Sequence, residues 1–396
     1  MVYIIEGSRT AFGSYGGSFL NTTDVDLGVA VTKEALNRSN VTADNIDEII
    51  FGNIIHTGTN SAYLARHIGL KSGLSETSSA LTLNRLCGSG LQAIVSGTQS
   101  ILLGDVDIVV AGGTENMSRA PHVLRGTRFS NPNKAPIVDD MLWGTLTDEY
   151  IGCGMGMTAE NLAKKYEISR DQQDEFSVLS HQKAAQASQS GRFAVEIVPV
   201  ETKNARGKSI VVNQDEHIRP DSSIEKLGSL KPAFLKDGTV TAGNASGIND
   251  GAAAVVIASE KAVKSNNLKP ISRVVAWAVA GVDPNIMGIG PVPATLKVLE
   301  KANLSINEID LFELNEAFAA QSLAVLKELQ IDPQKVNVNG GAIALGHPVG
   351  ASGARVTYSL AKELQLQNKK YGIATLCIGG GQGIAILLEN TNLKAT

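Results

Sequence analysis

The amino-acid sequence repeats itself at a fixed spacing of 263 residues (299 − 36). Residues 31–53 read VTKEALNRSNVTADNIDEIIFGN, and residues 294–316 read ATLKVLEKANLSINEIDLFELNE. The residues that match at this spacing are Leu36 and Leu299, Asn40 and Asn303, Thr42 and Ser305, Ile46 and Ile309, Asp47 and Asp310, Ser89 and Ser352, and Gly90 and Gly353. A spacing that stays constant over so long a stretch indicates an internal duplication, so we expect two similar halves.

Each half follows the same order of predicted elements. An amphipathic helix comes first, then a β-rich run, then a glycine-containing turn that opens a helix of small residues, and then an apolar strand. In the first half these segments are 28–39, 48–54, 88–103 and DIVVAGG; in the second they are 292–302, 309–314, 351–365 and GIATLCIGGG. Strands that alternate with helices are typical of α/β folds, so we expect mostly parallel sheets.

A long insertion interrupts the first half. In the second half CIGGGQG leads directly into the strand IAILLE, whereas VAGGTENMS is far from its equivalent strand GAAAVVIAS. We therefore predict an N-terminal half of residues 1–118 plus 248–267, an inserted loop domain of residues 119–247, and a C-terminal half of residues 268–396. Such insertions commonly bind substrate.

Composition argues against several classes of protein. The 396 residues include 35 Lys and Arg against 39 Asp and Glu, with no basic cluster that would suit nucleic acid. No run of about 20 apolar residues predicts a membrane span. Three cysteines are too few for a disulfide framework, and the start MVYIIEGSRT does not resemble a secretory signal, so we expect a cytoplasmic protein.

Cys87 stands in a glycine-rich turn, NRLCGSGLQAI, at a predicted helix start. Such a turn leaves backbone N–H groups unpaired and carries partial positive charge, which favours a thiolate. One interpretation is therefore a nucleophile with a lowered pKa, whose own N–H can bind an oxyanion. The other is a buried cysteine that only fills space.

The equivalent turn of the second half, NGGAIALGHPVGASGAR, contains His347. If the halves pack about a pseudo-twofold axis, the two turns face each other and a cysteine–histidine pair can activate the thiol. Cys377 ends the strand IATLC, where sites of α/β sheets lie, or is simply a buried strand residue. Asn315 and Glu316, in ELNEAFAA, can be interpreted as caps of the helix that follows.

The sequence resembles the thiolase family over almost its whole length, in the segments NRLCGSGLQAI, AGGTENMS, NASGINDGAA, ELNEAFAA, GGAIALGHPVGASGAR and CIGGGQG. Within that family it most resembles the biosynthetic acetyl-CoA acetyltransferases. The resemblance implies an α/β fold with a five-layered α-β-α-β-α core from two duplicated halves, and an inserted loop domain that holds coenzyme A. It implies reversible condensation of two acetyl-CoA to acetoacetyl-CoA and CoA, with ping-pong kinetics.

The resemblance also implies roles for individual residues. Cys87 becomes acetylated, His347 takes its proton, and Cys377 removes a proton from the second acetyl-CoA. Asn315 holds a water that forms one oxyanion hole with His347, and the N–H groups of Cys87 and Gly379 form the other. Two such sites are needed because charge develops on two different carbonyl oxygens.

Coenzyme A and acetyl-CoA are the implied substrates, with no permanently bound cofactor and no metal. The contacts that the resemblance implies are Ser246 with the pantetheine arm, Arg219 with the adenine or its phosphates, Phe234 with the pantetheine tunnel, and Met155, Met287 and Phe318 with the acyl pocket. Arg219 can also be interpreted as a solvated surface charge, and the apolar residues as ordinary core.

Gly154 departs from the family pattern, because many acetyl-specific members carry a histidine directly before this methionine, Met155. The missing bulk leaves open a degradative 3-ketoacyl-CoA thiolase of broader chain length. Cys377 argues against other condensing enzymes of the same fold, such as ketosynthases or hydroxymethylglutaryl-CoA synthase. The complete set of polar site residues argues against a non-catalytic acyl-CoA binding protein. We interpret Cys153 as a bystander.

The resemblance further implies a homo-oligomer, either a dimer or a tetramer. The segment PHVLRGTRFSNPNK, residues 121–134, is the expected excursion through which dimers would pair into a tetramer.

Overall fold

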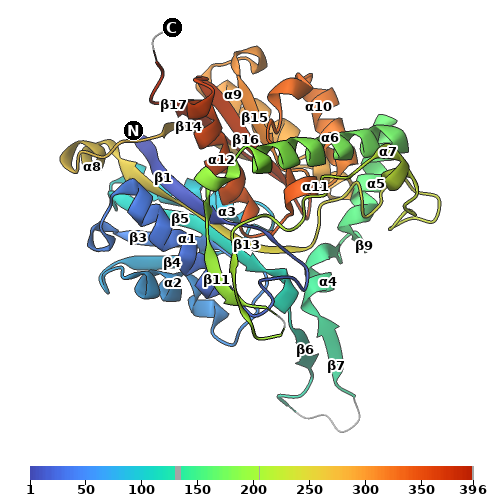
Figure 1. The fold of residues 1–396 in the computed structure, drawn as a ribbon, viewed down its shortest axis with the longest axis horizontal. Helices are drawn as coiled ribbons and strands as arrows, with labels where there is room; N and C mark the ends of the chain where they lie inside the picture. The colour runs from blue at the N-terminus through green and yellow to red at the C-terminus, as the bar shows by residue number, and fades with distance from the viewer. Residues whose placement is uncertain (130–134, 205, 395–396) are drawn as a thin grey trace.

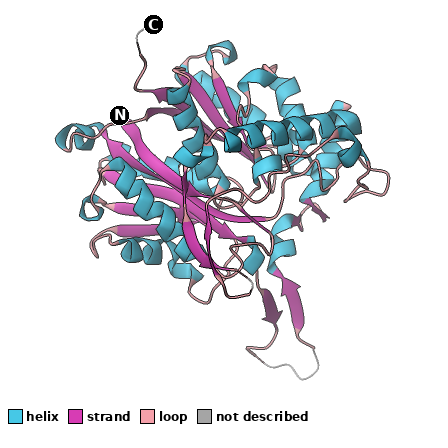
Figure 2. Cartoon of the chain, in the orientation of Figure 1, coloured by secondary structure: helices cyan, strands magenta, loops and turns pink. Residues whose placement is uncertain are grey.

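An 11-stranded mixed sheet runs through the centre of the molecule (Figures 1 and 2). The computed structural model describes residues 1–129, 135–204 and 206–394. The main path of the sheet has the order β15 (Leu311–Leu314), β16 (Tyr371–Ile378), β17 (Gln382–Asn390), β14 (Ser272–Gly281), β1 (Val2–Thr10), β13 (Asn249–Ser259), β5 (Ile108–Asn116), β3 (Glu48–Gly52) and β4 (Ser79–Leu83). Two short strands lie off this path, β2 (Gly13–Ser14) beside β13 and β10 (Ile197–Val198) beside β1.

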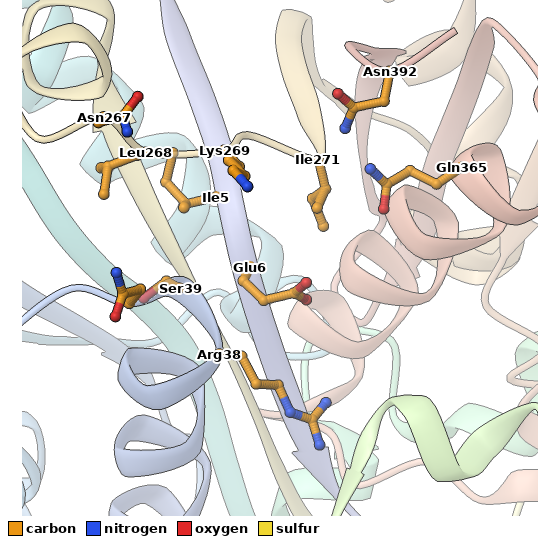
Figure 3. Close-up of a pocket in the computed structure, with 11 residues that line it drawn as sticks. Ile5, Glu6, Arg38, Ser39, Asn267, Leu268, Lys269, Ile271, Gln365 and Asn392 are labelled. Atoms are coloured by element: carbon orange, nitrogen blue, oxygen red, sulfur yellow. The ribbon is translucent and has the colours of Figure 1, made fainter. Parts of the chain in front are cut away.

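The duplication is visible in where the elements begin. Three pairs start 263 residues apart: β3 and β15 (311 − 48), β5 and β16 (371 − 108), and the helices α3 (Ser89–Leu103) and α12 (Ser352–Leu366) (352 − 89). The sheet consists of two half-sheets, one from β15 to β14 and the other from β1 to β4 in the order given above. They join where β1 pairs with β14 over Val2–Ile4. Beyond this point they separate, and a pocket of about 380 Å³ lies in the wedge, with Glu6, Arg38 and Lys269 among its lining residues (Figure 3).

Helices and half-sheets stack in five layers, which confirms the predicted core. Helices α1 (Asp24–Ser39) and α2 (Leu64–Ser72) cover one outer face, α9 (Pro291–Ala302) and α10 (Ala319–Leu329) cover the other, and α3 and α12 pack together between the half-sheets. Successive residues of β3 show the alternation, because Ile49 belongs to the outer hydrophobic cluster and Ile50 to the central one.

The prediction of mostly parallel sheets is wrong. Along the described main path, three strand pairs are parallel, namely β3–β4, β3–β5 and β15–β16, and the other five are antiparallel. A parallel pair needs a crossover of a dozen or more residues, so the tight turn between Ile378 and Gln382 makes β16 and β17 antiparallel. The other four antiparallel pairs bring together strands that are far apart in the sequence, and the local alternation of strands and helices does not set their direction.

The inserted segment forms small sheets and a helical layer. Its elements are β6 (His122–Arg125), β7 (Ile137–Asp140), α4 (Met141–Leu146), β8 (Thr147–Asp148), β9 (Cys153–Gly154), α5 (Met155–Tyr166), α6 (Arg170–Gln189), β10, β11 (Val200–Lys203), β12 (Ser209–Val212) and α7 (Ile224–Gly228). Helices α5 and α6 pack on α10 of the C-terminal half, and α6 also packs on the short α11 (Ala342–Leu345). The helix α8 (Glu260–Ser265) links β13 to β14. The domain boundaries at 119 and 247 stay a prediction.

Two features are absent from the described residues. No helix in this part of the chain is long and apolar enough to cross a membrane. Among the same residues, no group of three or more His, Cys, Asp or Glu side chains is arranged to hold a metal ion.

A buried ion network ties the three parts of the chain together. Arg9 of β1 is fully buried and makes a bidentate contact with Asp215 at 2.8 and 2.9 Å, while its Nε lies 3.0 Å from Glu196. Arg192 contacts Glu196 at 2.7 Å and Glu363 of α12 at 2.6 Å. Burial alone would raise the pKa of Glu196, but the charges of Arg192 and Arg9 lower that pKa to about 2.

We predict that Arg9→Ala lowers the free energy of unfolding by about 3–5 kcal/mol, because it leaves Asp215 and Glu196 buried without their cation. Chemical denaturation measures this change. The matched control is Lys261→Ala, which breaks an ion pair with Asp107 whose side chains are 80% and 40% exposed, so it should change the free energy of unfolding far less than Arg9→Ala does. Equal losses in the two variants would contradict the prediction.

Candidate active site

Cys87 lies in the turn that connects β4 to α3. The side chain of Asn84 accepts the N–H of Leu86 at 2.9 Å, and Leu86 has a φ of 46°, which residues other than glycine rarely adopt. The hydroxyl of Ser89 donates to the carbonyl of Leu86 at 2.7 Å and accepts the N–H of Arg85 at 2.8 Å. This turn holds the partly buried Cys87 directly before the first turn of the helix.

The thiol of Cys87 is held neutral by its surroundings. Burial raises its pKa and the charge of Glu115 adds to this, whereas hydrogen bonds from the backbone N–H groups of Gly379 and of Cys87 itself lower it, with a result of about 11. The lowered pKa predicted from the helix start is therefore wrong, because the anion loses more hydration than the two N–H groups return. The same two N–H groups are those of the predicted oxyanion hole.

His347 is buried in the matching turn of the C-terminal half. Its backbone N–H donates to Asn249 Oδ1 at 3.1 Å, its Nδ1 lies 2.6 Å from Ser352 Oγ, and its Nε2 lies 3.4 Å from Asn315 Nδ2. Burial, and then the charge of Arg355, lower the pKa of His347 to about 3. The imidazole is therefore neutral at neutral pH.

The turns that carry Cys87 and His347 meet. Cys87 packs on a small hydrophobic cluster that contains Val349, two residues beyond His347. Glu115 lies close to both turns. A charge on its carboxyl group raises the pKa of the Cys87 thiol, and its Oε2 accepts the N–H of Gly350 at 3.0 Å. The structure thus brings together the cysteine and histidine turns that the sequence predicted as partners.

Asn315 and Glu316 do not cap α10, so that interpretation is wrong. The helix begins after Phe318, with no side-chain cap. Asn315 is fully buried and faces His347, and its Oδ1 has no hydrogen-bond partner among the described residues. Glu316 instead accepts hydrogen bonds from Ser180 of α6 at 2.7 Å and from Asn337 at 2.8 Å. Glu316 therefore docks the inserted segment, while Asn315 offers a polar group to the site.

Cys377 ends in the predicted acyl pocket. It is fully buried near the end of β16 and belongs to one hydrophobic cluster with Met287, Phe318 and Met155. Burial raises the pKa of Cys377, and the negative charge of a Cys87 thiolate adds to this effect. All three residues predicted to line the acyl pocket therefore lie with the second cysteine.

A pocket of about 360 Å³ opens beside the two cysteines. It is lined by Leu86, Met155 and Gly379, and by the inserted residues Gly144, Thr145, Thr147, Asp148 and Glu149. Because Gly379 also bonds the sulfur of Cys87, this pocket lies next to the candidate nucleophile.

Two of the three remaining contacts predicted for coenzyme A lie near this region. The ring of Phe234 packs edge-on against Phe318 with 6.2 Å between ring centroids, and the N–H of Ser246 donates to the carbonyl of Ala317 at 3.0 Å. Arg219 is exposed, and its guanidinium donates to the backbone carbonyl of Glu216 at 3.0 Å. The predicted contact of Arg219 with the adenine or its phosphates stays a prediction.

Sequence reasoning missed three residues that hold the site. Asn249 and Ser352 fix His347, as described above. Glu115 is fully buried, and it accepts the N–H groups of Ile54 at 3.1 Å and Ile55 at 3.0 Å besides that of Gly350. A carboxylate at the end of an otherwise uncharged strand, in AGGTENMS, is the signal that could have found Glu115.

Comparisons with known proteins agree with this geometry. The family model "Thiolase, N-terminal domain" matches residues 2–261, and "Thiolase, C-terminal domain" matches residues 268–390. The chain is 49% identical to the mitochondrial 3-ketoacyl-CoA thiolase of Rattus norvegicus and 48% identical to an acetyl-CoA acetyltransferase of Rhizobium meliloti, over 98% of each chain in both cases. The structure of human mitochondrial 3-ketoacyl-CoA thiolase in complex with CoA superposes with a TM-score of 0.95, at 47% identity, over 99% of this chain and 98% of that one.

The duplicated halves, the paired turns and the two cysteines thus occur in a chain that family models match almost from end to end. We conclude that the chain belongs to the thiolase family and is a thiolase-type acyltransferase.

Proposed function

We propose that the protein cleaves 3-ketoacyl-CoA thioesters with coenzyme A, and forms them in the reverse direction, for chains of four carbons and longer. Condensation of two acetyl-CoA to acetoacetyl-CoA is then the shortest case of the same reaction. The relatives named above include a 3-ketoacyl-CoA thiolase and an acetyl-CoA acetyltransferase at 49% and 48% identity, so identity does not choose between the two ranges. Gly154 supports the broader one.

Nothing in the backbone or the packing requires a glycine at position 154. Its φ of −74° and ψ of 160° suit any residue, and an added Cβ would meet only the carbonyl oxygen of Leu146, at 3.6 Å. Its strand partner Thr147 and its neighbour Met155 both line the 360 Å³ pocket. The missing side chain therefore leaves room beside the acyl pocket for a longer chain.

The first half of the proposed reaction transfers the acyl group to Cys87. Its thiol passes a proton to His347 as the sulfur attacks the 3-keto carbonyl, and the N–H groups of Cys87 and Gly379 bind the oxyanion. The bond between C2 and C3 then breaks, and Cys377 gives its proton to the carbon of the leaving acetyl-CoA enolate. The proton held by His347 then restores Cys377.

The second half releases the product. The thiol of coenzyme A gives its proton to His347 and attacks the acyl carbonyl on Cys87. The carbon–sulfur bond to Cys87 breaks, and His347 returns the proton to the freed cysteine. During enolate formation, the oxygen of the second thioester faces Asn315 and His347, whose side chains are buried where they meet little water.

The other expectations from the sequence stay proposals. We place the pantetheine arm along Ser246 and Phe234, and the nucleotide of coenzyme A near Arg219. A homo-oligomer is supported by the exposed apolar residues of the β6–β7 hairpin, Leu124, Ile137 and Val138, although residues 130–134 of the predicted excursion lie outside the described residues. The cytoplasmic location rests on the sequence alone.

We predict that the purified protein cleaves acetoacetyl-CoA and 3-ketooctanoyl-CoA with comparable kcat/KM. In Gly154→His the ring fills the free space, so kcat/KM for the eight-carbon substrate should fall about 10- to 100-fold while the four-carbon value changes little. Gly154→Ala is the matched control and should keep both activities. Cleavage of acetoacetyl-CoA alone by the wild type would contradict the broad range, and cleavage of neither by folded protein would refute the proposed reaction.

We predict that the two cysteines separate in partial reactions. In Cys377→Ala, acetyl-CoA should still acetylate Cys87, which intact-protein mass spectrometry detects, while thiolysis falls by about 100-fold or more because the enolate finds no proton donor. In Cys87→Ala neither acetylation nor thiolysis should occur. An acetylated Cys87→Ala protein would place the nucleophile elsewhere.

We predict that alkylation of Cys87 by iodoacetamide becomes faster throughout the range from about pH 7 to pH 10. Because the pKa of its thiol is raised to about 11, the reactive thiolate is a small fraction in this range and grows about tenfold for each pH unit. Cys87→Ala supplies the background rate. A plateau near neutral pH would show a thiolate in the free enzyme and contradict the prediction.

A further inference from the structure

We propose that Ser352 is a positioning residue that holds His347 in the tautomer with its proton on Nδ1, so that Nε2 is free to accept the proton of Cys87. The part played by Nε2 rests on the proposed function. The tautomer itself follows from hydrogen bonds that are independent of any substrate.

The hydroxyl of Ser352 has one proton, and two acceptor groups lie close to it. Its Oγ is 2.9 Å from the carbonyl oxygen of Pro348, to which it donates, and 2.6 Å from Nδ1 of His347. Once the proton points to the carbonyl, the oxygen can only accept from the ring. Nδ1 must then carry the hydrogen.

The duplicated turn shows a serine that donates to a nearby carbonyl and accepts from nitrogen, although its carbonyl is one position further along the turn. Ser89 is the counterpart of Ser352 at the spacing of 263 residues (352 − 89). Its hydroxyl donates to the carbonyl of Leu86 at 2.7 Å and accepts from the backbone N–H of Arg85 at 2.8 Å. A backbone N–H can only donate, so this serine donates to a carbonyl and accepts from nitrogen. In the second turn His347 Nδ1 takes the place of that N–H.

The opposite edge of the ring agrees with this tautomer. Nε2 of His347 faces Nδ2 of Asn315 at 3.4 Å. The amide nitrogen carries hydrogens and no free acceptor site, so a second N–H on Nε2 would point donor against donor. The lone pair of Nε2 therefore lies on the side of the ring where Asn315 and the predicted oxyanion hole are.

Ser352 is a neutral group, and this suits the proposed role of His347 as a base that carries a positive charge only while it holds the proton of Cys87. The side chains that bond the ring are those of Ser352 and Asn315, which carry no charge, and the nearby charge of Arg355 disfavours an imidazolium. His347 is thus oriented without being charged in advance. It can accept the proton of Cys87 when a thioester carbonyl takes up the electrons of the sulfur.

Nitrogen NMR of protein labelled in its histidine rings tests the tautomer directly. The wild type should show a protonated Nδ1 and an unprotonated Nε2 for His347 at neutral pH, with His347→Ala used to assign the signals. A wild-type ring protonated on Nε2 would overturn the proposal. Because this spectrum is recorded without substrate, its result is separate from success or failure of the proposed reaction.

Substitution tests whether Ser352 causes the preference. Ser352→Ala should give a mixture of both tautomers and reduce kcat about 10- to 100-fold with KM for coenzyme A unchanged. Ser352→Thr keeps the hydroxyl and should restore the wild-type spectrum. The matched control, Ser89→Ala, removes the twin serine and should leave the spectrum of His347 as it is. A wild-type tautomer in Ser352→Ala would refute the role of Ser352.

Discussion

The backbones of the two central helices touch where both helices begin, and the site depends on this contact. A Cβ at Gly90 would stand 2.6 Å from the backbone nitrogen of Ala354, and a Cβ at Gly353 would stand 2.3 Å from that of Leu91. Any larger residue at either glycine would push α3 and α12 apart. Each helix starts directly after its functional turn, so this approach sets how far apart those turns lie. The two glycines are themselves related by the duplication.

A site assembled from two halves needs groups that lock those halves together. Glu115 links the two halves close to the candidate active site, because it accepts the N–H of Ile54 from the first half and the N–H of Gly350 from the second. The network around Arg9 does it at a distance, since it joins β1, the inserted segment and α12. In both cases a buried ionisable side chain is bonded by partners from different parts of the chain. Such groups are costly when unpaired, so they favour a single arrangement of the parts.

The sequence predicted the features that depend on local pattern or on the repeat. The two similar halves and the meeting of the Cys87 and His347 turns follow from the repeat, whereas the five layers and the residues predicted for the acyl pocket were implied by the family resemblance. The strand directions did not follow from either, because most antiparallel pairs join strands that are far apart in the sequence and become neighbours only in the fold. The pKa of Cys87 was predicted to be lowered, whereas burial raises it. A helix start is visible in a sequence, but the depth of burial is not.

The duplication also explains how one turn came to serve two chemical tasks. In the first half the turn presents a thiol, and its serine is occupied by backbone groups alone. In the second half, Gly350 stands at the position that matches Cys87, and its N–H donates to the carboxyl group of Glu115. Ser352, which matches Ser89, lies within hydrogen-bond distance of the His347 ring. Only a glycine fits at position 350, because a Cβ at Gly350 would stand 2.7 Å from Glu115 Oε2 and 2.8 Å from the carbonyl oxygen of Thr114. A nucleophile and its base can therefore come from copies of the same turn, provided that each copy gives up the other's side chain.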